Sequence, residues 1–245
     1  MLSRASDLSA DVAERCSISS SKYMERYHVK FYLDDAVTLA VETREENPVQ
    51  TLAKYFRRVH QGRHCLHRKY SYIRETLHNR ISFANCVVSF FSRTPSTDNI
   101  SLHDHWQLSS LLCPDMPCLH HERAAAILSV SMATAIPRAQ VLSYWQLFFI
   151  YDEYLVAFAK VFQECQAAAS AMSSAADSSS APLFVDRHTL LWNLRGLLSE
   201  KRWEVGFPSS IAMENVLQAA SDSKFSSFRQ VVAEMAASKM ISHAD

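Results

Sequence analysis

Glycine is unusually scarce in this chain, since only three of its 245 residues are glycine. Gly62, Gly196 and Gly206 lie too far apart for the glycine-rich turns that hold nucleotide phosphates or for the elbow of serine hydrolases. With only seven prolines in addition, the chain lacks the turn residues that a many-stranded sandwich or barrel needs. The sequence therefore predicts an all-α fold. It also predicts that the protein is not an enzyme, because no nucleophile, base and oxyanion donor can be assembled from it.

The charges of the chain balance. Lysine plus arginine and aspartate plus glutamate number 25 each, so no net field draws the protein to nucleic acid or to a membrane. The first twenty residues are polar, and no later apolar run reaches the length of a membrane span. Six cysteines are scattered without a C-x-x-C pair. We therefore expect reduced thiols in a soluble, intracellular protein that binds no nucleic acid and no membrane.

Two amphipathic helices are predicted near the N-terminus, after a disordered tail over residues 1–21. Apolar residues recur at helical spacing from Tyr23 to Val41. Asn47 and Pro48 then supply an N-cap and a first-turn proline for a second helix, and Gly62 is placed to end it in the left-handed conformation. This helical hairpin, residues 22–62, is too small to bury both apolar faces alone, so we expect it to bind a partner or a second copy.

The hairpin resembles the dimerisation/docking module of the protein kinase A type II regulatory subunit. The likeness rests on the Tyr32-Leu33 opening, Arg44, the Asn47-Pro48 step and the block from Leu52 to Phe56. The resemblance implies a homodimer, in which two hairpins form a four-helix bundle whose outer groove accepts an amphipathic helix. The partner-binding residues that it implies are Leu33, Val37, Leu52, Ala53 and Phe56.

Residues 63–165 repeat one layout, an isoleucine followed by a helix rich in aromatic and aliphatic residues. The three segments are Arg80 to Phe91, Asn99 to Leu112 and Ala135 to Phe149. The layout resembles the loop end and exiting helix of EF-hands. With Ile100 and Ile136 at the eighth loop position, arginine, proline, serine and alanine stand where calcium ligands are needed. We therefore predict degenerate EF-hand-like helix pairs that hold no calcium and need no cofactor.

The remainder of the chain divides into two parts. Residues 166–182 are rich in alanine and serine, which is typical of a linker or a frayed helix end. Residues 183–240 are expected to form a C-terminal helical segment that packs on the preceding domain. Its predicted helices are Leu183–Leu198, Ile211–Leu217 and Phe225–Met235.

Six blocks taken together resemble one family, the centriolar satellite-associated tubulin polyglutamylase complex regulators. They are YLDDAV from Tyr32, HNRISFANCVVSFF from His78, QLSSLLCPDMP from Gln107, QLFFIYDEYL from Gln146, FPSSIAMENVL from Phe207 and SKFSSFRQVV from Ser223. The resemblance implies a non-catalytic adaptor that binds polyglutamylase complex subunits and microtubules, and that restrains or places the addition of glutamate chains to tubulin. It also implies a location in the cytoplasm and cytoskeleton, at centriolar satellites, the centrosome or the basal body of cilia.

Two other readings stay open at this point. One is a cytoskeletal or axonemal docking-domain scaffold that binds an amphipathic helix and has no part in glutamylation. The other is a calcium sensor, which the missing carboxylates disfavour. The resemblance leaves open whether the protein activates or inhibits glutamylation, and it does not set the oligomeric state.

Basic residues are concentrated between Lys54 and Arg80, where eight lysines and arginines accompany a single acid, Glu75. Such a segment fits the acidic tubulin tail or a glutamate chain, and salt should weaken the contact. The alternative is a solvated helix face with ion pairs to the acidic residues between Asp34 and Glu46. The residues that we expect to bind acidic tails are Arg57, Arg58, Arg63, Arg68 and Lys69.

Four further motifs suggest chemistry but favour structural roles. The run Cys113-x4-Cys118-x-His120-His121 lacks a second ligand pair, so we predict no zinc site. His103 and His105 are expected in a capped, solvated helix start. Cys65 lies between histidines, but without an oxyanion hole we do not expect it to be a nucleophile. The aromatic run from Tyr144 to Phe158 is expected to form core.

Overall fold

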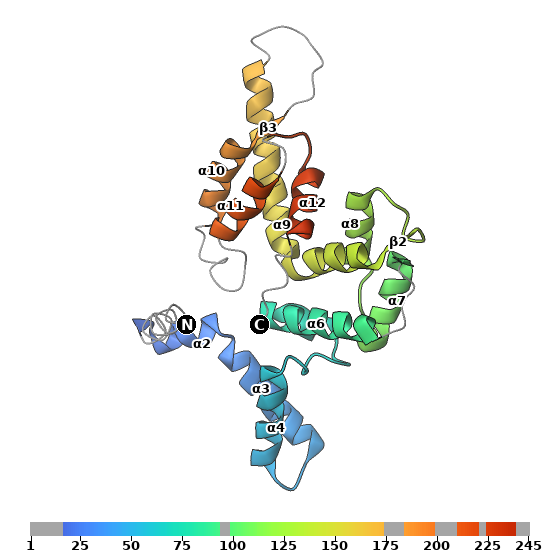
Figure 1. Cartoon of the computed structure of the whole chain (residues 1–245). Helices are drawn as coiled ribbons and strands as arrows, with labels where there is room; N and C mark the ends of the chain where they lie inside the picture. The colour runs from blue at the N-terminus through green and yellow to red at the C-terminus, as the bar shows by residue number, and fades with distance from the viewer. Residues whose placement is uncertain (1–16, 94–98, 174–183, 199–209, 221–223, 239–245) are drawn as a thin grey trace, which may run out of the picture. The chain divides into compact units, whose positions relative to one another are not determined.

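The computed structural model describes residues 17–93, 99–173, 184–198, 210–220 and 224–238 (Figure 1). The described chain is mostly helical, with two small two-stranded sheets, so the prediction of a helical fold is confirmed at that level. It divides into two compact units, an N-terminal unit up to His64 and a C-terminal unit from Cys65 onward. No helix within the described ranges is long and apolar enough to cross a membrane. The predicted tail lies almost entirely outside the described residues.

The described part of the N-terminal unit, from residue 17 onward, has three helices. They are α2 (Ser20–Arg26), α3 (Val29–Thr43) and α4 (Pro48–His60). The prediction of one continuous helix from Tyr23 to Val41 is therefore wrong, because the chain breaks at Tyr27 and His28, where His28 has a φ of 50°. None of the residues of α2 is buried. Packing against α4 therefore fixes the position of α3. Since α2 buries no residue, nothing requires it to continue along the axis of α3.

Both ends of α4 are formed as the sequence predicts. The side-chain oxygen of Asn47 accepts a hydrogen bond from the N–H of Gln50 at 3.0 Å, and Pro48 occupies the first turn. After the helix, Gly62 has a φ of 64°, the left-handed conformation that a residue without a Cβ adopts at little cost. Asn47, Pro48 and Gly62 thus set the bounds of α4 by local chemistry alone.

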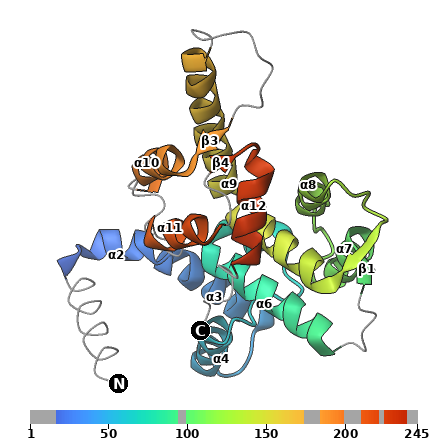
Figure 2. The same cartoon turned by 45° about the horizontal axis from the view of Figure 1, so that its top comes forward.

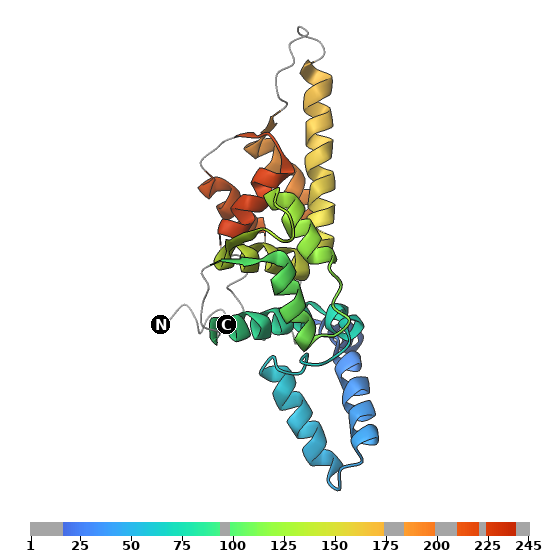
Figure 3. The same ribbon diagram turned by 90° about the vertical axis from the view of Figure 1, so that its right-hand side faces the viewer.

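The hairpin of α3 and α4 has a small core. Three residues are buried there, Tyr32 and Ala36 from α3 and Tyr55 from α4. The hydroxyl of Tyr55 donates to the carboxylate of Asp35 at 2.7 Å, which joins the two helices a second way. Partly buried apolar side chains complete the contact, namely Phe31, Leu39, Leu52 and Val59. The two helices lie side by side and antiparallel (Figure 3).

Among its described residues, the C-terminal unit begins with four helices. They are α5 (Tyr70–Glu75), α6 (Leu77–Arg93), α7 (Leu102–Leu112) and α8 (Leu119–Leu128). Strand β1 (Asn99–Ser101) precedes α7, and strand β2 (Ala135–Pro137) precedes the long helix α9 (Arg138–Ser173). The strands are antiparallel, and Ile100 lies opposite Ile136.

The second part of the C-terminal unit also has a two-stranded antiparallel sheet, among three further described helices. Its elements are β3 (Val185–Asp186), α10 (Arg187–Leu198), α11 (Ser210–Ala219), β4 (Lys224–Phe225) and α12 (Phe228–Ala237). Val185 lies opposite Phe225, and Figure 2 shows the two strands together beside α9. The helix predicted from Leu183 starts at Arg187, because the Asp186 carboxylate accepts the free N–H groups of His188 and Thr189. Phe225 belongs to β4, so the last helix begins three residues later than predicted.

Helix α9 supplies the centre of the core. Trp145, Phe149, Tyr154 and Phe158 are buried along it, which confirms the aromatic run as core. The helix continues through Ser173, so the part of the predicted linker before residue 174 is helical, in keeping with the high helix propensity of its alanines. The rest of that linker lies outside the described residues.

Candidate partner-binding surfaces

The hairpin exposes large apolar side chains on both of its helices. Leu33, Val37 and Val41 on α3 and Val49 and Phe56 on α4 have between 39% and 74% of their surface accessible. Ala53, also predicted as a partner-binding residue, is exposed as well. Leu52 is the exception among the five predicted positions, because it packs partly into the hairpin core against Tyr32, Ala36 and Tyr55. We call Leu33, Val37, Val41, Val49, Ala53 and Phe56 the apolar face.

Helical geometry brings these side chains to one side of the hairpin. On α3, Leu33 and Val37 each directly follow a buried residue, and on α4 Phe56 directly follows the buried Tyr55. One residue rotates a helix by roughly 100°, so the exposed row is displaced from the buried row in the same rotational sense on both helices. Because the helices are antiparallel, equal rotations turn the two rows to the same side. The exposed residues therefore form one surface of two rows.

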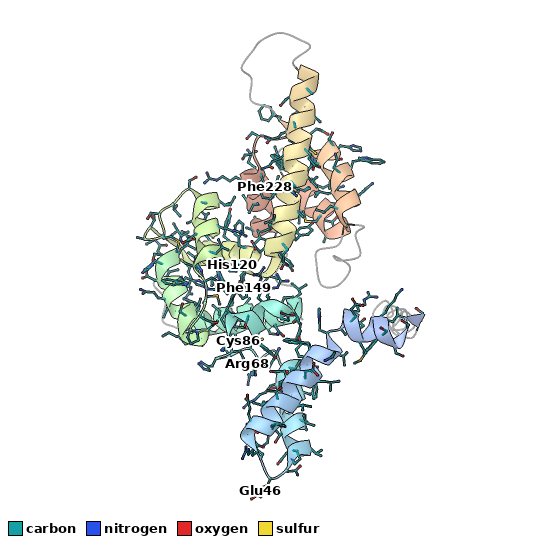
Figure 4. The ribbon with its side chains drawn as sticks, turned by 180° about the vertical axis from the view of Figure 1, so that it is seen from behind. Glu46, Arg68, Cys86, His120, Phe149 and Phe228 are labelled. Carbon is teal, nitrogen blue, oxygen red and sulfur yellow. The ribbon has the colours of Figure 1, made fainter. Side chains whose placement is uncertain are left out.

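The turn between α3 and α4 is held by side chains, so the apolar face is fixed in shape. The carboxylate of Glu45 accepts a hydrogen bond from the Thr51 hydroxyl at 2.8 Å and an ion pair from Lys54 at 3.3 Å. The Thr51 bond, followed by Lys54, lowers the pKa of Glu45. Glu46 lies at the tip of the turn (Figure 4). Lys54 is thus engaged in an internal pair with the acidic segment, as the alternative reading of the basic run predicts for individual residues.

The predicted acidic-tail-binding residues are divided between the two units. Arg57 and Arg58 lie in the last turn of α4, and Arg63 follows it, all three exposed. Arg68 and Lys69 belong to the C-terminal unit, where the Arg68 guanidinium lies 3.9 Å from the centre of the Tyr72 ring. Each unit therefore carries its own part of the predicted set.

His105, His120 and His121 of α7 and α8 are buried, which corrects the expectation for His105, whereas His103 is exposed as expected. The predicted cap exists, since the Ser101 hydroxyl accepts from the N–H of Asp104 at 3.0 Å, but His105 is 0% exposed. Its Nδ1 lies 2.8 Å from Nε2 of His121. Burial lowers the pKa of His105 to about 3 and that of His121 to about 2. The pair is neutral and belongs to the core, where Trp145 packs on both rings.

The cysteines near these histidines are not arranged as metal ligands. Cys113 is buried, its thiol donates to Asp115 at 3.3 Å, and burial raises its pKa to about 12. Cys65 is buried too, with its thiol directed to the carbonyl of Asn79 at 3.4 Å. Across the described part of the chain, no three histidine, cysteine or carboxylate groups are placed to hold a metal ion.

The segment Ser129–Gln140, which the sequence predicts to be the second EF-hand-like loop, is held by hydrogen bonds from other protein groups. Ser129 stands at the first ligand position, and its hydroxyl is bound by the guanidinium of Arg229 from α12. The N–H of Thr134 donates to the carbonyl of Ser131 at 3.0 Å. A cationic side chain therefore binds the residue at the position where a calcium-binding loop has its first carboxylate. In the first predicted loop, residues 93–104, positions 94–98 lie outside the described residues.

The ion pairs around α9 were not anticipated from the sequence. Arg80 was counted in the exposed basic run, but its side chain is only 9% exposed and pairs with Glu153 at 3.1 Å. Arg123 pairs with Asp152. The partners lie 73 residues apart in the first pair, so no local pattern could have shown it. The sequence contains a weak indication that His105 is buried, because Leu102, His105 and Ser109 recur at helical spacing and so lie on one face of the helix.

Comparison with known proteins extends these observations. A family model described as the CSTPP1 N-terminal domain matches residues 17–62, which span the hairpin. Centriolar satellite-associated tubulin polyglutamylase complex regulator 1 of Danio rerio is 27% identical over 242 residues, covering 90% of this chain and 72% of the relative. The proteins of the same name from Mus musculus and Homo sapiens are 32% and 30% identical over 158 residues.

The shared region differs in extent between these relatives. The match to the mouse and human proteins covers 62% of this chain and 48% of theirs, so it spans about half the length of those relatives. No solved structure matches the chain. The likeness to the kinase regulatory-subunit module stays a prediction. The hairpin match and the similarity along nine-tenths of the sequence confirm the predicted resemblance: the chain is similar to the centriolar satellite-associated tubulin polyglutamylase complex regulators, and its hairpin matches the N-terminal domain of that family.

Proposed function

We propose that this protein is a non-catalytic regulator of the tubulin polyglutamylase complex, acting at centriolar satellites as an adaptor that binds the complex and microtubules. The observation that carries the proposal is the similarity to a regulator of that name along 90% of this chain. His105, His121 and Cys65 are used in packing and internal hydrogen bonds, which fits a binding role.

The apolar face of the hairpin is the proposed site for a protein partner. Exposed Val37, Val41 and Val49 contribute nothing to the hairpin core, and a surface of two antiparallel rows matches the stripe of an amphipathic helix. The polyglutamylase complex supplies such a helix, or a second copy of the hairpin covers the face in a homodimer. Leu52 acts indirectly, by holding α4 against α3.

Arg57, Arg58 and Arg63, together with Arg68 and Lys69, are the proposed contacts to acidic tubulin tails. Exposed guanidinium groups bind carboxylates in bidentate fashion, and Arg68 is held in a fixed orientation over Tyr72. Contacts of this kind act over about 10 Å at 0.1 M salt and weaken as salt rises.

Degenerate EF-hand-like pairs are the proposed plan of the C-terminal unit. The support is the register of its strands. Ile100 pairs with Ile136, and both stand at the eighth position of a twelve-residue loop. The pair of Val185 and Phe225 repeats the arrangement before α10 and α12. Arg229, bound to Ser129, replaces the ion in holding the second loop.

Affinity purification of the tagged chain from its own cells, with mass spectrometry, tests the proposal. We expect polyglutamylase subunits and tubulin in the parent sample, and loss of tubulin at raised salt. The Val37→Asp variant should lose the complex subunits. Val156→Asp is the matched control, because Val156 is an equally exposed valine on α9 of the other unit.

Other outcomes decide between the proposals. Recovery of cytoskeletal anchor proteins without any polyglutamylase subunit would favour the scaffold reading and reject the regulator. Unchanged capture by Val37→Asp would reject the apolar face. Light scattering of the purified chain separates the two occupants, since a homodimer through the hairpin doubles the mass and Val37→Asp restores the monomer.

A further inference from the structure

Helix α9 changes direction at Tyr151, in the middle of the C-terminal unit. Tyr151 has a φ of −115° and a ψ of 27°, outside the helical region. Proline and glycine, the usual causes of a kink, are absent from the surrounding sequence between Gln146 and Leu155. The kink must therefore be imposed by contacts with other elements. Figure 1 shows the two arms of α9 running in different directions.

The two arms pack against different helices. On the first arm, Phe149 contacts Phe83 of α6 and His120 of α8 (Figure 4). On the second arm, Phe158 and Phe162 contact Phe228 of α12. The kink thus marks the boundary between a first helix group, α5 to α8 with the first arm, and a second helix group, the second arm with α10 to α12.

The two residues that follow the kink are both acidic, and both are held by arginines of the first helix group. Arg123 from α8 pairs with Asp152, and Arg80 from α6 pairs with Glu153 at 3.1 Å. The Arg80 side chain is 9% exposed. A charge buried to that degree is stable only with a partner, so the pair constrains where Glu153 can lie.

A neutral histidine completes the surroundings of the kink. His120 of α8 lies with its ring edge toward Phe149, at 5.5 Å between ring centres, and its Nε2 is 2.7 Å from the Tyr70 hydroxyl of α5. Burial first, and then the charges of Arg123, Arg74 and Arg80, lower the pKa of His120 to about 4. The ring is therefore uncharged beside Phe149 and does not compete with the arginines for the two carboxylates.

We propose that Arg80, Arg123, Asp152 and Glu153 form a clamp that fixes the angle between the two helix groups. Each ion pair joins the start of the second arm to a different helix of the first group. Two attachments to separate helices restrain both bending and rotation about the kink, which one attachment does not. The clamp turns a break in α9 into a rigid joint and gives the C-terminal unit one defined shape.

The test is a distance measurement across the joint in the full chain. Spin labels are attached through bioorthogonal side chains at Gln107 on α7 and Gln163 on the second arm, both exposed. Double electron–electron resonance should give one narrow distance distribution for the parent. In the Asp152→Asn/Glu153→Gln variant, which keeps side-chain shape and removes both charges, the distribution should broaden by about twofold. Hydrogen exchange of amides 150–155 should rise by about tenfold.

A matched variant separates the clamp from general loss of charge. Arg195 and Glu214 form an ion pair at 3.0 Å within the second helix group, so Glu214→Gln removes a comparable pair away from the joint. It should leave the distance distribution unchanged. A parent-like distribution in the Asp152→Asn/Glu153→Gln variant overturns the proposal, and so does equal broadening by Glu214→Gln. Circular dichroism confirms that each variant is folded.

Discussion

The hairpin and the C-terminal unit are both helical, but they use their apolar residues in opposite ways. The hairpin buries Tyr32, Ala36 and Tyr55 and leaves a row of valines, a leucine and a phenylalanine in solvent. The C-terminal unit gathers most of its apolar residues into one continuous core, which includes buried aromatic side chains from α6, α9 and β4. Composition alone does not separate the two regions.

The difference shows where each unit obtains its stability. A core of three residues contributes little against the chain entropy of two ordered helices, so the hairpin gains by covering its apolar face with another surface. The C-terminal unit satisfies its core internally and can act as a fixed platform. The proposed partner binding is therefore expected at the hairpin rather than in the core of the C-terminal unit.

The largest effect is expected in the core of the C-terminal unit. Trp145 is 0% exposed and contacts His105, His121 and Phe149. Trp145→Ala should lower the free energy of unfolding of this unit by about 3–5 kcal/mol, from lost burial and a residual cavity. Urea unfolding followed by circular dichroism measures the change. If hydrogen exchange in α3 and α4 collapses to the same extent, the two units do not fold independently.

Acid should destabilise the C-terminal unit through its buried histidines. His105, His120 and His121 have pKa values of about 3, 4 and 2 in the folded protein, against about 6.5 when unfolded. The unfolded chain therefore binds more protons below pH 6.5, so stability is full above that pH and is lost as the pH falls. The slope is about 1.4 kcal/mol per pH unit for each histidine.

Urea midpoints between pH 7.5 and pH 5 measure this slope. For the His121→Leu variant, the free energy of unfolding should fall with decreasing pH about one third less steeply than for the parent, since one of the three titrating groups is gone. Each protein is compared with its own value at pH 7.5. A slope equal to that of the parent would show that His121 does not titrate on unfolding in this range.

Local chemistry explains which features could be read from the sequence. Asn47, Pro48 and Gly62 define α4 because each acts on its own backbone neighbours. The break at His28 has no such marker, because it reflects where packing on α4 stops. The burial of Arg80 could not be predicted either, since its partner Glu153 comes from a distant part of the chain. The predictions that were wrong concern features that depend on tertiary contacts.

Matched helix caps in the two units sharpen the comparison at a smaller scale. Asn47 caps α4 and Ser101 caps α7, each through a side-chain oxygen that accepts a backbone N–H at 3.0 Å. Replacing either by alanine should cost about 1 kcal/mol. For Asn47→Ala we expect faster hydrogen exchange in α3 and α4 alone, and for Ser101→Ala a lower urea midpoint of the C-terminal unit. Spreading of the Asn47→Ala effect into α9 would contradict the division into units.

The smallest stability effect is expected on the apolar face itself. Val37 is 55% exposed and lies outside the hairpin core, so Val37→Ala should change the free energy of unfolding by less than about 0.5 kcal/mol. Tyr55→Ala, which removes a buried ring, is the contrasting variant and should unfold the hairpin. If the face binds a partner, Val37→Ala weakens capture of that partner while the melting temperature of the free protein stays constant. If Val37→Ala instead lowers the melting temperature of the free protein, Val37 belongs to the hairpin core, and weaker capture would reflect lost stability.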